Sequence, residues 1–238
     1  MRKYCFILAS VLVAMFWATD ANAQITVGAG YNLETITMSA QGDSDSESLN
    51  GFYLEATYGW KFLDKSWGAL ALQPGVRFAY MGESETEKED GLRMKSSWDE
   101  TYLDIPVHVK YTYGLGSVKL SAFAGPVFSF GLSSTNTSRI RGEVLGEDVD
   151  YLYKYNNYTG KTVTKGEGTT SSTEGGLVDY GRFDLKLGIG LGASFMERYN
   201  VKVGYNIGLL NRYTGEQVED YRVRMSTGVF YIGLGYNF

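Results

Sequence analysis

Residues 185–195 read LKLGIGLGASF, and every second position of this stretch, from Leu185 to Phe195, is apolar. Glycine or a polar residue fills the positions between. Successive side chains of a β-strand point to opposite faces, so an apolar residue at every second position is typical of a strand with one apolar face. A helix would instead place apolar residues three or four positions apart. The stretch therefore predicts a β-strand.

The same alternation recurs in seven further segments: 25–33, 52–60, 70–80, 101–113, 120–130, 201–209 and 230–238. No helical period of useful length occurs between them. The sequence therefore predicts an all-β protein of eight strands.

The composition excludes several other classes of protein. The 238 residues include one Cys and one His, too few for a disulfide scaffold, a CxxC redox centre or a zinc cluster. Charged residues make up 21% and hydrophobic residues 44%, which fits neither a disordered chain nor a bundle of transmembrane helices. Thirty Gly, nineteen Tyr and twelve Phe suit a chain of strands.

The first 23 residues have the layout of a secretory signal peptide. Arg2 and Lys3 precede an apolar run over 4–18, and small residues over 21–23 predict cleavage between Ala23 and Gln24. The single cysteine, Cys5, would leave with this segment. We therefore expect a mature domain over 24–238.

Alternation alone does not separate a soluble sheet from a membrane barrel, but the connections between strands do. Three connections are short (61–66, 114–117 and 196–200), and four are long and polar (39–50, 82–100, 133–179 and 211–220). Short periplasmic turns at one end and long extracellular loops at the other are typical of outer-membrane barrels.

Aromatic residues and the last strand favour the same architecture. Aromatic side chains collect near the short turns, as expected at a membrane interface: Trp60, Trp67, Tyr111, Tyr113, Phe195, Tyr199, Tyr236 and Phe238. We expect the C-terminal strand to pair with the first strand and close the barrel. Its outward residues would be Phe230, Ile232, Leu234, Tyr236 and Phe238. The prediction is an eight-stranded antiparallel transmembrane β-barrel, with ten strands as the alternative if 133–179 adds two.

The polar face of the strands would then line the lumen. Eight strands leave an interior that side chains just fill. We expect a polar network that plugs the lumen, made of Glu55, Arg77, Asp104, His108, Lys110, Lys119, Asp184, Lys186 and Lys202. Buried charges of both signs need such pairing.

Two features of the strands raise separate expectations. Pro74, Pro106 and Pro126 lie inside predicted strands, where proline lacks a ladder donor, so we expect a bulge at each. His108 is the one candidate catalytic base, but Asp104 lies about 13 Å away along the strand, too far for a dyad. A lumen histidine is therefore the favoured interpretation.

The long connections carry the surface chemistry. Acidic residues in 39–50, 82–100 and 211–220 disfavour nucleic-acid binding, and their spacing lacks the pattern of a calcium loop. In the third connection Tyr151, Tyr153 and Tyr155 alternate before a turn at Asn156 and Asn157. We expect a hairpin that protrudes from the membrane and offers these tyrosines to a protein partner.

Short motifs in four strands resemble the PorT-like outer-membrane β-barrel family. They are YLDIPV at 102–107, FAGP at 123–126, YNIGLLN at 205–211 and YNF at 236–238. The resemblance implies an eight-stranded barrel in a Gram-negative outer membrane, inserted by the barrel assembly machinery, which reads the aromatic last strand. It also implies a link to protein secretion, but no functional residue of that family matches a position here.

We therefore expect a non-catalytic outer-membrane barrel that holds no cofactor or metal and contacts membrane lipid. Its expected function is structural or surface interaction, including an accessory role in secretion or envelope assembly. A narrow channel for small solutes is the first alternative, and an outer-membrane hydrolase is the second.

Overall fold

The computed structural model describes residues 23–238, except 90, 145–146, 167, 177 and 216–221. The predicted signal peptide lies outside these residues, apart from Ala23. Eleven strands make up the described chain: β1 (Ala23–Ala40), β2 (Asp43–Lys65), β3 (Gly68–Glu89), β4 (Leu92–Leu115), β5 (Val118–Val144), β6 (Glu147–Asn156), β7 (Thr162–Gly166), β8 (Thr169–Thr173), β9 (Phe183–Phe195), β10 (Tyr199–Gly208) and β11 (Val223–Asn237).

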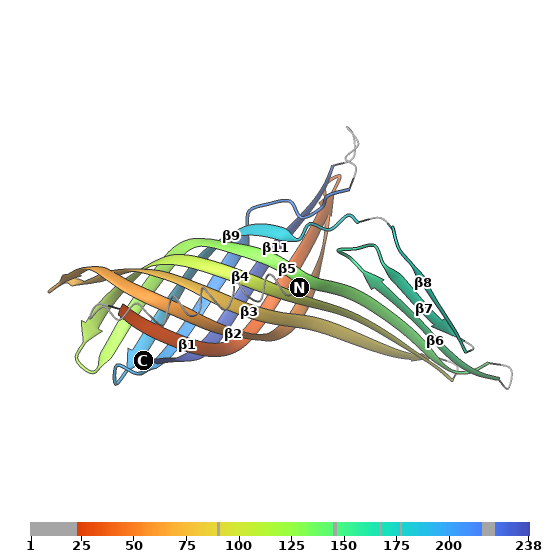
Figure 1. Cartoon of the computed structure of the whole chain (residues 1–238), viewed down its shortest axis with the longest axis horizontal. Helices are drawn as coiled ribbons and strands as arrows, with labels where there is room; N and C mark the ends of the chain where they lie inside the picture. Colours follow the sequence, from red (N-terminus) through yellow and green to blue (C-terminus); the bar gives the residue numbers. More distant parts are fainter. Residues whose placement is uncertain (1–22, 90, 145–146, 167, 177, 216–221) are drawn as a thin grey trace.

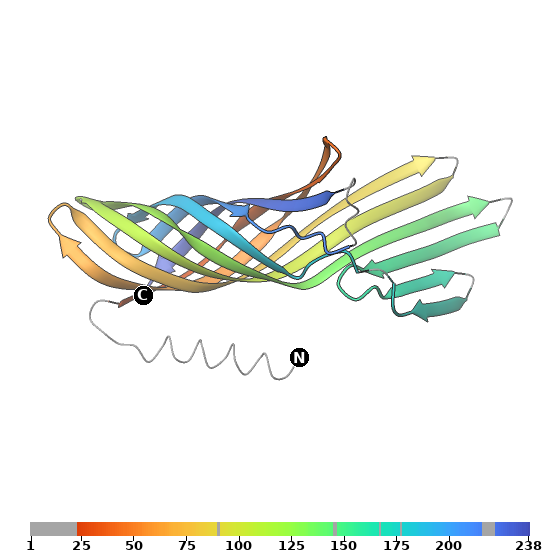
Figure 2. The ribbon, with the colours of Figure 1, turned by 90° about the horizontal axis from the view of Figure 1, so that it is seen from above.

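Eight of these strands close into an antiparallel barrel (Figures 1 and 2). The order around the ring is β1, β2, β3, β4, β5, β9, β10 and β11, and β11 pairs with β1 from Asn237 opposite Thr26 onward. The predicted eight-stranded barrel and its closure by the C-terminal strand are therefore confirmed.

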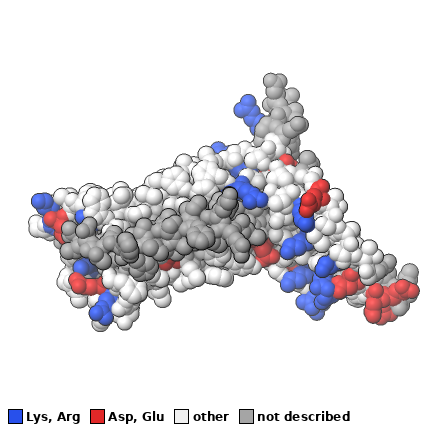
Figure 3. Space-filling view, viewed as in Figure 1, with Lys and Arg blue, Asp and Glu red and all other residues white. Residues whose placement is uncertain are grey.

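The alternation along each strand points its apolar face outward. In β3, Arg77 is 2% exposed and faces the lumen, whereas the next residue, Phe78, is 42% exposed. On the face seen in Figure 3, charged side chains gather toward the two ends of the molecule, and the described surface between them is largely free of them. This arrangement, with the polar face inward and the apolar face outward, suits a barrel whose outer surface meets lipid. Among the described residues, no helix is long and apolar enough to cross a membrane.

The short connections are tight turns, as predicted, but three of the four long connections are largely strand rather than loop. β1 to β5 continue past the barrel as paired hairpins, so that most of 39–50, the described part of 82–100 and much of 133–179 are strand (Figure 2). The extensions are solvated, so their polar sequence carries no apolar alternation to reveal them.

The third of these extensions contains the expected hairpin. β6 carries Tyr151 and Tyr153 and turns back into β7, with Leu152 opposite Lys165. β6 also pairs with β5, which changes partner from β9 to β6 above the barrel. Neither β6, β7 nor β8 joins the ring, so the ten-strand alternative is wrong.

The prediction of a β-bulge at each of the three prolines is also wrong. Around Pro74, Pro106 and Pro126 the ladder skips rungs toward one neighbouring strand and keeps the same register on both sides of the gap. Each proline remains aligned with its other neighbour, for example Pro126 with Leu187. The register shifts lie elsewhere, at Lys61 to Leu63 and at Thr101 to Tyr102. A missing N–H donor can thus be accommodated by an open rung without an inserted residue.

Candidate functional site

A cluster of paired charges fills the middle of the lumen. Glu55 on β2 lies opposite Arg77 on β3, and two hydrogen bonds of 3.0 and 3.2 Å join the guanidinium to its carboxylate. Lys202 reaches the other oxygen of Glu55 from β10. The guanidinium carbon of Arg77 also lies 4.6 and 4.2 Å from the ring centres of Tyr53 and Tyr231. Three of the nine predicted network residues, Glu55, Arg77 and Lys202, therefore form one cluster.

His108 and Lys110 lie on the turn side of this cluster and line a cavity of about 30 Å³. That volume accommodates about one water molecule. The His108 ring packs on Phe123 at 5.1 Å, and its Nε2 atom has no hydrogen-bond partner among the described residues. Asp104 instead accepts a 2.6 Å hydrogen bond from Ser129. The barrel thus separates His108 from the acid considered for a dyad.

The remaining predicted lumen residues divide between the two ends of the barrel. Asp184 is buried and accepts a 2.7 Å hydrogen bond from Thr227, and Lys186 lies 3.8 Å from Glu34. Lys119 lies near the short turns, where it pairs with Glu197 at 2.8 Å and is half exposed. It therefore stands apart from the buried network.

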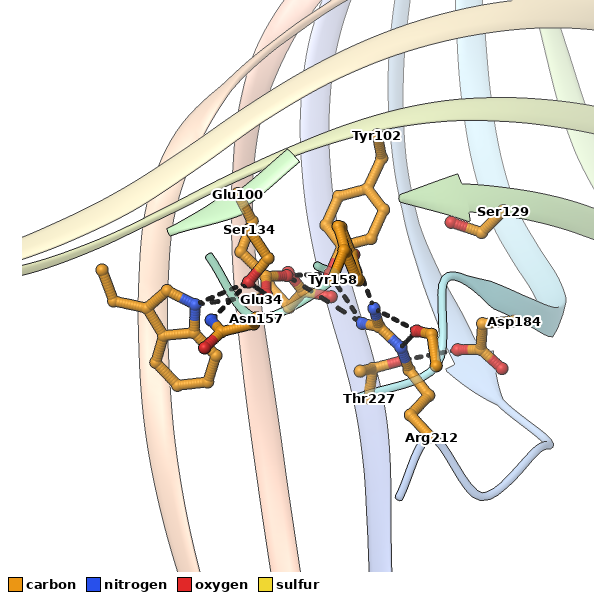
Figure 4. A network of polar contacts seen from close by, with 12 residues as sticks. Glu34, Glu100, Tyr102, Ser129, Ser134, Asn157, Tyr158, Asp184, Arg212 and Thr227 are labelled. Atoms are coloured by element: carbon orange, nitrogen blue, oxygen red, sulfur yellow. Dashed lines mark hydrogen bonds and ion pairs between the residues drawn. The ribbon is translucent and has the colours of Figure 1, made fainter. Parts of the chain in front are cut away.

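A second network, absent from the prediction, closes the extracellular mouth around Arg212 (Figure 4). Arg212 lies in the β10–β11 connection and is 1% exposed. It donates hydrogen bonds to the hydroxyls of Tyr102 at 2.6 Å and Tyr158 at 3.0 Å. Its guanidinium carbon lies 4.1 Å from the ring centre of Tyr180. Burial raises the pKa of the Tyr158 phenol well above its ordinary value, so this acceptor stays neutral.

Glu100 completes this cap and links it to the barrel wall. It accepts hydrogen bonds from Ser134 at 2.7 Å and Trp98 at 3.2 Å, and from Tyr102. The Arg212 guanidinium lies 3.9 Å from its carboxylate. Charge on a connection is thus neutralised by charge on a strand.

Two residues of this second network could have been predicted from the sequence. Glu34 and Glu100 continue the inward phase of their strands, two residues beyond Asn32 and two before Tyr102. Extending the alternation beyond the apolar residues would have found them. Arg212 lies in a connection, and nothing in its local pattern marks it.

Above the cap, the extracellular extensions border an open cavity of about 1140 Å³. Its lining combines aromatic, hydroxyl and acidic side chains from seven strands (β1 to β6 and β11) and from the connections. Tyr153 and Tyr155 are part of the lining, whereas Tyr151 is exposed and lies outside it. Two of the three predicted partner tyrosines therefore face this cavity. Among the described residues, no group of three His, Cys, Asp or Glu could hold a metal ion.

One comparison with known proteins identifies the family of this chain. A family model described as an outer membrane protein beta-barrel domain matches residues 6–238. No curated protein matches the chain.

Several solved structures are similar at low sequence identity. Ail of Yersinia pestis is 13% identical, covers 91% of this chain and 99% of its own, and has a TM-score of 0.38. Neisserial surface protein A is 13% identical over 90% of this chain and 97% of its own, also with a TM-score of 0.38. The Escherichia coli outer membrane protease OmpT is 9% identical over 92% and 98%, with a TM-score of 0.33. No residue role is transferred from these structures.

Proposed function

We propose, on the premise that the chain belongs to the outer membrane protein beta-barrel domain family, that it is a closed barrel whose extracellular extensions bind a partner. Its location is the outer membrane of a Gram-negative bacterium. The observation that carries the proposal is the contrast between the two spaces of the molecule. The lumen is filled by side chains and holds a cavity of about 30 Å³, whereas the extensions border an open cavity of about 1140 Å³.

The filled lumen disfavours a solute channel. A conducting path would have to separate Glu55 from Arg77 and Lys202 and displace the Arg212 cap, and breaking buried pairs is strongly unfavourable. We therefore assign the barrel a supporting role, and the extensions the interaction. The proposal includes an accessory role in secretion or envelope assembly, as the PorT-like resemblance implies.

The proposed barrel is not an enzyme. A histidine base needs a nucleophile and an orienting acid within hydrogen-bond reach. Nε2 of His108 has neither among the described residues, and its neighbour on the ring face is Phe123. This supports a packing role for His108.

Two measurements test the proposal. In planar lipid bilayers, we expect the purified barrel to give no sustained single-channel steps, and regular large steps would contradict a closed lumen. On cells, shortening the β5–β6 and β3–β4 extensions by whole hairpin rungs should abolish capture of a surface partner while the barrel still inserts. Unchanged capture would place the interaction elsewhere and overturn the proposed role of the extensions.

A further inference from the structure

The barrel wall splits into two diverging edges at its extracellular side. β2 and β3 pair up to Asn50 opposite Gly82. Beyond that point, among the described residues, 43–49 pairs only with β1 and 83–89 only with β4. Figures 1 and 2 both show the β1–β2 hairpin turning away from the β3–β8 extension. The backbone N–H and C=O groups along the facing edges of 43–49 and 83–89 therefore have no partner strand in the part of the chain that the structure describes. Such an edge can accept an extended segment of another chain.

The two edges carry carboxylates that face a shared space. Asp45 and Glu47 on β2, and Glu83 and Glu85 on β3, line the 1140 Å³ cavity together with Asp179. None of the ion pairs between described residues includes any of these five. The described lining contains no Lys, Arg or His. The potentials of five unneutralised acids add in one concave space.

Aromatic rings supply a second, independent feature of the same cavity. Five of them belong to its lining: Trp98, Tyr153, Tyr155, Tyr180 and Tyr213. The faces of such rings attract ammonium and guanidinium groups. Tyr180 is 7% exposed, and its ring already contacts the Arg212 guanidinium and Tyr158, so the less buried rings of Tyr153, Tyr155 and Tyr213 are the ones open to a ligand. The lining thus offers both aromatic rings and carboxylates to one ligand.

From these features we propose that the cavity between β2 and β3 binds an extended, basic segment of a partner protein. The inference rests on the proposed surface-interaction role and names the chemistry of its partner. Lys and Arg side chains of the segment lie against the carboxylates and rings, and its backbone pairs with a free strand edge. A polyanion is excluded by the charge of the lining.

The test uses the full barrel in detergent and a synthetic peptide of alternating Lys and Thr as the probe. The cavity variant carries Asp45→Asn, Glu47→Gln, Glu83→Gln and Glu85→Gln. The matched control loses four carboxylates that lie outside the cavity lining and outside both strand edges: Glu143→Gln, Glu147→Gln, Asp148→Asn and Glu174→Gln. We expect fluorescence anisotropy to show affinity about tenfold weaker for the cavity variant and within about twofold for the control. Circular dichroism checks that both variants stay folded.

Two further probes separate a peptide from other cations. The same peptide with N-methyl groups at alternate residues cannot pair fully with a strand edge, so we expect it to bind more weakly. Spermine should bind more weakly than the peptide because it has no backbone. Equal binding of either probe would overturn the assignment to an extended peptide.

Equal loss in the cavity variant and its control would overturn the cavity as the site. Failure of the wild-type barrel to bind the basic peptide, with surface capture still dependent on the extensions, would overturn this inference and leave the proposed function standing.

Discussion

Arg77 is held by Glu55 on one side and by the rings of Tyr53 and Tyr231 on the other, and all four side chains are buried. Replacing Arg77 by Met leaves a buried carboxylate with one partner, Lys202. Breaking a buried pair in this way costs about 3–5 kcal/mol. We expect the free energy of unfolding to fall by that amount in urea titrations of the barrel in lipid vesicles.

Lys119→Ala is the matched control for that substitution. Lys119 pairs with Glu197, but both side chains are largely solvated. An exposed pair contributes about 0–1 kcal/mol. A loss for Arg77→Met no larger than that for Lys119→Ala would show that the central cluster does not hold the barrel together.

Asp150 lies on the β5–β6 extension, and we expect it to make the stability of that extension depend on pH. The 2.6 Å hydrogen bond donated by Arg139 is the main cause that lowers the pKa of Asp150 from 3.8 to about 2. A carboxylate with a lowered pKa stabilises the folded form above its ordinary pKa, and this contribution is lost as the pH falls through about 2. We expect hydrogen-exchange protection of β5–β6, corrected for intrinsic rates, to fall between pH 4 and 2. The same fall in Asp150→Asn would contradict this origin.

At the scale of elements, glycines that face each other across the β1–β11 ladder leave room for the ring of Tyr53. Gly30 lies opposite Gly233, and Tyr53 packs over both. A Cβ at position 233 would overlap the Tyr53 hydroxyl and lie 2.8 Å from the carbonyl oxygen of Ala29. Overpacking of this kind costs about 1–3 kcal/mol. We expect Gly233→Ala to lower the midpoint of urea unfolding accordingly.

Gly59→Ala tests whether this effect comes from the close approach. The nearest atom to a Cβ at Gly59 is the carbonyl oxygen of Gln24, 3.5 Å away, which is ordinary contact. This variant should unfold at nearly the wild-type midpoint. Equal destabilisation by the two variants would mean that alanine in the ladder, rather than the Tyr53 contact, is responsible.

Arg212 and a backbone bridge between Tyr180 and Tyr213 hold the described part of the β10–β11 connection over the mouth. Arg212→Ala removes the hydrogen bonds to Tyr102 and Tyr158 and leaves Glu100 buried without its cation. We expect the connection to open more often, and limited proteolysis within it to become about tenfold faster or more. Arg222→Ala removes an exposed arginine from the same connection and should leave the cleavage rate unchanged. Equal rates for Arg212→Ala and the wild type would mean that other contacts hold the cap.

At the scale of the whole molecule, the parts of the fold that meet lipid could be predicted from the sequence. Lipid requires an apolar residue at every second position of a spanning strand, so Phe78 beside Arg77 reveals both the strand and its faces. Outside the membrane this requirement ends. The extension of β3 reads Glu83, Ser84, Glu85 and Thr86, which resembles a polar loop although it is paired strand.

The candidate site could be predicted only where its residues lie on the barrel strands. Glu55, Arg77 and Lys202 share the inward phase of strands, so the alternation places them in one lumen. Arg212 meets Tyr102 across a sequence separation of 110 residues, and its own connection has no period. Only the closed barrel brings such residues together.

The continuity of β5 has a mechanical consequence. This single strand runs for 27 residues, and about half of it lies beyond the last rung shared with β9 at Phe130 and Phe183. At about 3.3 Å per residue, that half gives a lever of about 45 Å along the strand. The strand is continuous from this half into the part that pairs with β9. A force applied to the extracellular tip of β5 is therefore transmitted along the covalent backbone into the wall of the barrel. A partner bound at the tip is kept at a set distance from the lipid surface.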